Sequence, residues 1–288
     1  MTPPSTDAPR LPLHLWWTTL RRAVVKGLQD QVGLMAGGIA FFAILALAPA
    51  LIALVALFGL TTSPSRTAAV AGWLADALPE TARPLVLEQL QSVVSGGTGS
   101  LTTACVVAGA TALWSASGST QKLLTSIQWV YDRPETRGTL RLYSLAVVLA
   151  LGAAVFMVVA VALLVGTPAL VGRLGTGARV IAEVGRWVLL ALLVVTALAV
   201  VYRVSPDRDG PRWRWLTPGA VVAGIGWLAG SVLFSIYVDD FASYGQTYGA
   251  LAGVAVVMLW LYLTAYVVLM GAEINAEAER LAGSGADE

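Results

Sequence analysis

Histidine and cysteine are almost absent from this chain, since His14 and Cys105 are the only residues of these types in 288 positions. One cysteine excludes an intrachain disulfide, and one histidine excludes a Cys/His zinc cluster and a haem held by two histidines of the same chain. Charged residues are also scarce, at 12%. The sequence therefore predicts no metal site, no cofactor and no catalytic residue.

Hydrophobic residues, in contrast, make up 57% of the chain and are gathered in long blocks. About 20 apolar residues in a helix cross the hydrocarbon core of a bilayer. We predict an all-α, polytopic membrane protein with six transmembrane helices. Their approximate ranges are 34–60, 101–129, 142–166, 187–204, 216–238 and 247–272.

The segments outside these spans differ in character. Residues 1–13 contain four prolines and predict a disordered tail, whereas residues 14–33 interleave tryptophans and leucines with Arg21, Arg22 and Lys26 and predict a helix in the membrane interface. Residues 61–100 predict an external cap of two short amphipathic helices, either a plain cap or a gate over an opening. The membrane domain thus covers 14–275, and 276–288 form a tail.

The distribution of Lys and Arg predicts the orientation of the chain. With the N-terminus inside, 13 of the 18 basic residues fall on the inner side and five on the outer side. Because inner loops carry the excess of Lys and Arg, both termini are expected in the cytoplasm and the protein in a bacterial inner membrane.

Glycines recur along the last hydrophobic run, residues 243–275. Gly245, Gly249 and Gly253 are four residues apart, and Gly271 follows Gly253 by 18 residues, which is five helical turns. A helix edge without side chains permits close approach of another backbone in lipid. We expect helix packing at this edge, and it is also where a homo-oligomer would form.

A polar stripe accompanies the glycines. At 100° per residue, Tyr248, Tyr262, Tyr266 and Glu273 lie within about 40° of one another on a straight helix. The stripe is a candidate substrate path. The alternatives are an aromatic belt for Tyr248 and Tyr266, and solvation or an arginine partner for Glu273.

Two other spans contain features that interrupt an apolar helix. Ser115, Ser117 and Ser119 give the second span a hydroxyl-rich face, which either lines a cavity or bonds to its own helix carbonyls. Pro49 removes a donor in the first span and predicts a kink, used either for packing or for a lined passage.

Acidic and basic residues also meet in the expected inner loops. We predict that Glu135 pairs with an inner arginine, either Arg137 or one between 203 and 214, and so closes the cytoplasmic side. The basic residues are divided among short loops without aromatic residues for base stacking, so no nucleic-acid partner is expected. Membrane lipids are the expected partners.

Several stretches carry a family resemblance. They are IAFFAILALAPAL at 39–51, LWSASGS at 113–119, YDRPETR at 131–137, YRVSP at 202–206, WRWLTPGA at 213–220, YGQTYGALAG at 244–253 and GAEINAE at 271–277. The sequence resembles the YihY/BrkB-type bacterial inner-membrane family, once labelled ribonuclease BN. The resemblance implies six spans, cytoplasmic termini, an external helical cap, and a role in serum resistance or export of envelope lipid.

Two functional hypotheses follow. The first is a transporter or flippase-like protein that acts on an amphipathic, lipidic substrate of the cell envelope. The second is a non-transporting membrane scaffold that affects envelope assembly or surface resistance through partners. A nuclease is disfavoured because no nucleophile, base or carboxylate cluster is brought together by the sequence pattern.

Overall fold

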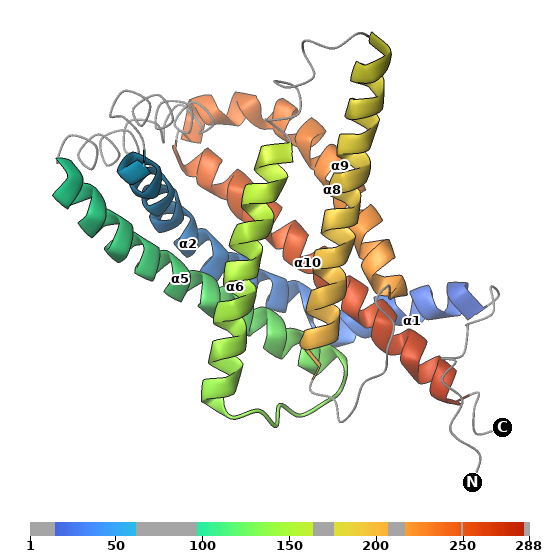
Figure 1. The fold of residues 1–288 in the computed structure, drawn as a ribbon. Helices are drawn as coiled ribbons and strands as arrows, with labels where there is room; N and C mark the ends of the chain where they lie inside the picture. Colours follow the sequence, from blue (N-terminus) through green and yellow to red (C-terminus); the bar gives the residue numbers. More distant parts are fainter. Residues whose placement is uncertain (1–14, 62–96, 164–175, 207–216, 249, 285–288) are drawn as a thin grey trace.

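The computed structural model describes residues 15–61, 97–163, 176–206, 217–248 and 250–284, and all secondary structure in these ranges is helical. In chain order the helices are α1 (Leu15–Gln29), α2 (Val32–Thr61), α5 (Gly97–Val130), α6 (Thr139–Val161), α8 (Thr176–Val204), α9 (Pro218–Tyr248) and α10 (Ala250–Ser284). Figure 1 shows them as an open bundle with α10 through its middle. The predicted all-α fold is confirmed for the described residues.

Five of these helices are long and apolar enough to cross a membrane. Their candidate spans are Val32–Leu57, Thr139–Ala160, Gly177–Val204, Pro218–Val238 and Ala252–Leu281. Only 11% to 28% of the residues in their apolar windows are buried inside the protein. Apolar surface exposed on this scale needs lipid rather than water around it. The helices therefore belong to a membrane protein.

The predicted second span corresponds to α5, which has 34 residues and so the length to cross a bilayer. Its Ser, Thr, Gln and Lys side chains lower its hydropathy, and it is not among the five candidate spans. The predicted cap at 61–100 lies almost entirely outside the described residues. Six spans with an external cap therefore remain a prediction.

Three helices are longer than the spans predicted for them, although the candidate span of α9 ends at Val238, where the fifth span was predicted to end. The fourth span, expected at 187–204, starts at Thr176, since Glu183 and Arg186 pair within the helix instead of ending it. The fifth and sixth helices extend to Tyr248 and Ser284, beyond the expected ends at 238 and 272. Apolar length marks the part of a helix that suits lipid, and these helices continue past it.

The single helix assumed for the last glycines and tyrosines is also wrong. Gly245 and Tyr248 belong to α9, whereas Gly253, Tyr262, Tyr266, Gly271 and Glu273 belong to α10. The 100° step between residues holds only within one continuous helix. Gly245 and Tyr248 therefore do not extend the edge and the stripe of α10, and Gly249 lies outside the described residues.

The first two helices are joined by a tight turn. α1 ends at Gln29, and Gln31 adopts a left-handed conformation with φ of 56° before α2 begins at Val32. The amide of Leu34 donates to the carbonyl of Gln31 at 2.8 Å, which closes the first turn of α2. A separate helix thus precedes the first candidate span, and it lies against α10 (Figure 1).

Small residues allow α2 and α5 to run side by side, the most extensive helix contact of the described chain (Figure 1). A methyl at Gly118 of α5 would lie 3.4 Å from the ring of Phe42 on α2. Lys122 places its ammonium 5.8 Å from the centre of the same ring. α2 continues as one helix through Pro49.

Backbones approach most closely where α9 crosses α10. Gly219 and Gly271 face each other, and a Cβ added to Gly219 would overlap the carbonyl oxygen of Gly271. The buried amide of Gly219 donates to Asn275 Oδ1 at 2.7 Å, and Asn275 Nδ2 donates to the Thr217 hydroxyl at 3.1 Å. Gly271 of α10 thus packs directly against α9 at this crossing.

Replacing Gly271 with alanine should destabilise the fold. The new methyl would lie 2.7 Å from the Ala223 Cβ and 2.9 Å from the Gly219 carbonyl oxygen. Overpacking of this kind costs about 1–3 kcal/mol. This cost exceeds the stabilisation that alanine gives over glycine inside a helix. The thermal midpoint of the purified protein in detergent should fall. Gly152→Ala in α6, where nothing lies within 4 Å, is the control and should not lower it. Equal midpoints for the two variants would contradict this account.

Candidate functional site

Two of the three candidate serines of α5 donate hydrogen bonds to backbone carbonyl groups. The hydroxyl of Ser117 is buried and donates to the Leu113 carbonyl at 2.6 Å, and that of Ser119 donates to the Ile39 carbonyl of α2 at 3.0 Å. Ser115 lies partly exposed on the same helix. Ser117 thus bonds to its own helix and Ser119 joins α5 to α2.

The tyrosines of α10 pack within the bundle. The rings of Tyr262 and Tyr266 are stacked with centroids 6.1 Å apart, and both rest on the hydrophobic core. The Tyr262 hydroxyl lies over Gly33 of α2, 3.1 Å from where a Cβ would be. The side chain of Tyr248 is outside the described part of the structure. In this conformation the described tyrosines fill space between helices and line neither of the two described pockets.

Glu273 differs from the tyrosines. Its side chain is fully buried, and no hydrogen-bond donor among the described residues reaches either carboxylate oxygen. The carboxyl group of Asp30, in the turn between α1 and α2, lies within hydrogen-bonding reach of Glu273, and the cations Arg280 and Lys26 are also near it. Asp30 also has one buried oxygen, Oδ2, without a partner. Two acidic side chains therefore meet where α10 passes the α1–α2 turn.

Salt bridges lie next to Asp30 and Glu273, and those of the described residues include Asp30 but not Glu273. Lys26 Nζ lies 3.1 Å from Asp30 Oδ1 and 3.6 Å from Asp132, just beyond the end of α5. Arg280 of α10 lies 2.7 Å from Asp132 and also pairs with Glu277. The hydrogen bond to Asp30 raises the pKa of Lys26, so this ammonium remains charged. The network joins α1, α5 and α10 at one end of the bundle.

Glu135 and Arg137 form a second ionic cluster in the loop between α5 and α6. Glu135 Oε1 lies 2.7 Å from Arg137 Nε, and Gln128 of α5 donates to Glu135 Oε2 at 3.2 Å. Arg137 also donates to the carbonyls of Val204 and Ser205, at 3.2 and 2.6 Å. The guanidinium therefore joins this loop to the end of α8.

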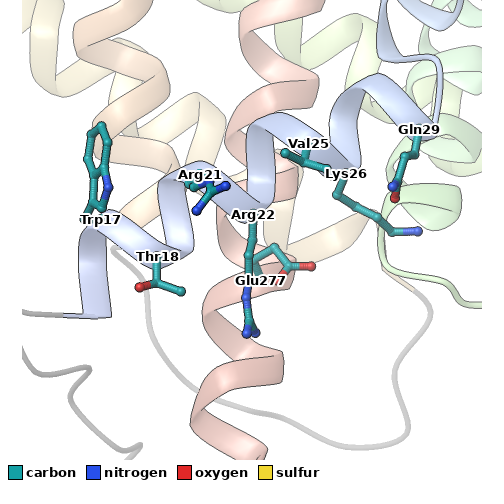
Figure 2. A pocket seen from close by; sticks show the side chains of 8 residues that line it. All are labelled: Trp17, Thr18, Arg21, Arg22, Val25, Lys26, Gln29 and Glu277. Atoms are coloured by element: carbon teal, nitrogen blue, oxygen red, sulfur yellow. The ribbon is translucent and has the colours of Figure 1, made fainter.

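A pocket of about 540 Å³ lies along α1 and is closed on one side by Glu277 of α10. Figure 2 shows its lining side chains, which are Trp17, Thr18, Arg21, Arg22, Val25, Lys26, Gln29 and Glu277. The sequence identified the basic residues of α1, but it did not indicate that α10 supplies a wall. In the described ranges, no three His, Cys, Asp or Glu side chains are placed to hold a metal ion.

Comparison with known proteins identifies the family. The profile of the family described as Virulence factor BrkB matches residues 23–287, nearly the whole chain. The chain belongs to the BrkB family. This is a membrane-protein family without an established enzymatic activity, in agreement with the helical fold and its apolar spans.

Individual relatives of this BrkB-family chain carry different names. The ribonuclease-like protein YfkH of Bacillus subtilis is 33% identical over 248 residues, which are 83% of this chain and 86% of YfkH. A UPF0761 membrane protein of Tolumonas auensis is 36% identical over 85 residues, 30% of this chain and 28% of that relative. No solved structure matches the chain.

Removing the Glu135 carboxylate should destabilise the protein in a pH-dependent way. Burial alone would raise the pKa of Glu135, but hydrogen bonds from Arg137 and Gln128 outweigh it and lower the pKa below its ordinary 4.5. The stabilisation is therefore complete above about pH 4.5 and is lost as the pH falls through the lower, folded-state value. Glu135→Gln should cost about 1.5–3 kcal/mol at pH 7 and progressively less in acid.

The measurement is thermal unfolding in detergent across this pH range. Glu183→Gln is the control, since that side chain is 49% exposed and the glutamine amide oxygen can still accept a hydrogen bond from Arg186. If Glu135→Gln lowers the stability by the same amount at acidic pH as at pH 7, the ionic contribution is contradicted.

Proposed function

We propose that this BrkB-family protein is a transporter or flippase-like protein of the bacterial inner membrane that moves an amphipathic, lipidic substrate of the cell envelope. The proposal includes α5 as a sixth span and places both termini in the cytoplasm, following the excess of Lys and Arg on that side. The observation that carries it is the buried carboxyl group of Glu273, which no donor of the described residues reaches and which lies against the carboxyl group of Asp30.

A buried carboxylate without a partner is costly, and such a group inside a membrane helix is a functional candidate by default. The cost is avoidable, because glutamine has nearly the same shape and no charge. Glu273 lies beside Asp30, a further acid that an uncharged packing role would not require. We infer that this arrangement is one of two states, and that Glu273 gains a partner in the other.

The nearby cations indicate what the second state involves. Lys26 is held by Asp30 and Asp132, and Arg280 is held by Asp132 and Glu277. Either cation must exchange partners before it pairs with Glu273. Because these residues belong to α1, α10 and the end of α5, the exchange shifts these elements relative to one another. Such a discrete rearrangement is what alternating access in a transporter requires.

The second candidate function is a membrane scaffold without transport activity. It is favoured by the packing of Tyr262 and Tyr266 on the core and by the hydrogen bonds of Ser117 and Ser119. A homo-oligomer would suit a scaffold, but Gly271 is occupied by α9 of the same chain. An oligomer through glycine faces would therefore use open positions such as Gly152.

We propose no enzymatic activity and no nucleic-acid partner. The ribonuclease-like name belongs to YfkH. In the present chain, the basic side chains of the described ionic network are bound to carboxylates of the same chain, which leaves them poorly placed to hold a phosphate backbone.

Glu273→Gln should fold normally and transport lipid more slowly than the wild-type protein. The test reconstitutes the full chain in vesicles containing phosphatidylglycerol labelled on an acyl chain, and follows exposure of the inner-leaflet label to an impermeant quencher. The wild-type protein should speed exchange between leaflets. Glu273→Gln should slow it about tenfold, equivalent to an increase of about 1.4 kcal/mol in the activation free energy.

Glu183→Gln is the matched control, because it removes a partly exposed carboxylate of α8 and should retain the wild-type rate. Wild-type vesicles that exchange label no faster than protein-free vesicles would contradict lipid transport. Equal rates for wild type and Glu273→Gln would remove Glu273 from the mechanism.

A further inference from the structure

The pocket along α1 is built from two rows of side chains. Trp17, Arg21, Val25 and Gln29 are spaced four residues apart, and so are Thr18, Arg22 and Lys26. Residues at this spacing are neighbours on a helix surface. One row therefore combines an aromatic and an aliphatic side chain with a guanidinium, and the other contains only hydrogen-bonding and basic groups. Figure 2 shows the two rows along α1, with Glu277 of α10 opposite.

The charges of the pocket are not balanced by the described residues. Glu277 is the acid in the lining, and its carboxylate is held by Arg280 of its own helix. Lys26 is held by Asp30 and Asp132. Arg21 and Arg22 are both exposed and form no salt bridge within the described part of the chain. Two guanidinium groups are therefore available to an anion, and guanidinium suits phosphate through paired N–H donors.

The surroundings favour a lipid over a free anion. Trp17 is 76% exposed and Leu28 is 72% exposed, so α1 presents large apolar side chains next to its arginines. Only Asp30 and Gln31 separate α1 from α2, which begins a candidate span. A helix with exposed tryptophan and leucine, basic residues and a direct link to a span suits the interface of a bilayer. There the pocket faces headgroups, and Trp17 reaches the boundary with the acyl chains.

We propose that the pocket lined by Trp17, Thr18, Arg21, Arg22 and Lys26 binds the phosphate headgroup of an anionic phospholipid in the leaflet that contains α1. Arg21 and Arg22 bind the phosphate, Thr18 donates a hydrogen bond, and Trp17 packs on the glycerol and upper acyl region. This binding requires no transport, so it stands or falls separately from the proposed function.

The test is native mass spectrometry of the full chain in detergent, titrated with dioleoyl phosphatidylglycerol, dioleoyl phosphatidylcholine or inorganic phosphate. Phosphatidylglycerol adducts should exceed those of phosphatidylcholine and should weaken as the ionic strength rises. The double variant Arg21→Gln/Arg22→Gln should bind phosphatidylglycerol about 10- to 30-fold more weakly, as expected for two basic residues at a lipid surface. Both arginines are exposed, so the variant should keep the wild-type thermal midpoint.

The control Arg133→Gln/Arg141→Gln removes the same charge from two exposed arginines elsewhere and should retain binding. Trp17→Ala should weaken phosphatidylglycerol binding without creating affinity for inorganic phosphate. An equal loss in the control would overturn the pocket in favour of general charge attraction. Inorganic phosphate that displaces the lipid at comparable concentration would identify a free-anion site instead, and equal binding of phosphatidylcholine would exclude recognition of the negative charge.

Discussion

The close contact between Gly219 and Gly271 is the constraint on which the arrangement of the bundle depends. Lipid provides no hydrophobic drive between helices, so their association relies on backbone approach and on hydrogen bonds that side chains make across the interface. Both occur here, because the glycines permit the approach and Asn275 binds the Gly219 amide. α10 is fixed in this way against α9 and also contacts α1, α2 and α5. Its register therefore decides what its polar residues meet.

That register places Glu273 among groups that cannot satisfy it. Glu273 follows Gly271 by two residues. Its side chain points away from the α9 crossing and toward the turn between α1 and α2, where Asp30 lies. The nearby cations are held by other acids, so the carboxylate is buried at a cost that packing does not require. The close packing of α10 against α9 on one side thus holds Glu273 in a costly buried position on the other side.

The sequence predicts how residues of one helix lie relative to one another. It does not predict which residues of distant segments come into contact. Spacing within one helix placed Tyr262 and Tyr266 on the same side, and their rings are stacked, because helical periodicity fixes this relation. The same arithmetic failed at Gly245 and Tyr248, since it assumed one helix where the structure has two. The partners of Gly271 and Glu273, namely Gly219 and Asp30, lie on distant segments, and nothing in either segment specifies the other.

Lys26 connects the two candidate sites. Its ammonium binds Asp30, the neighbour of Glu273, and Lys26 also lines the pocket proposed for a phospholipid headgroup. A phosphate held by Arg21 and Arg22 adds a negative charge that competes with Asp30 for this ammonium. Any withdrawal of Lys26 from Asp30 takes a neighbouring positive charge away from this pair of acids. Headgroup binding at α1 would therefore favour the state in which Glu273 takes a new partner, and occupation of the interface would be coupled to rearrangement of the bundle through one side chain.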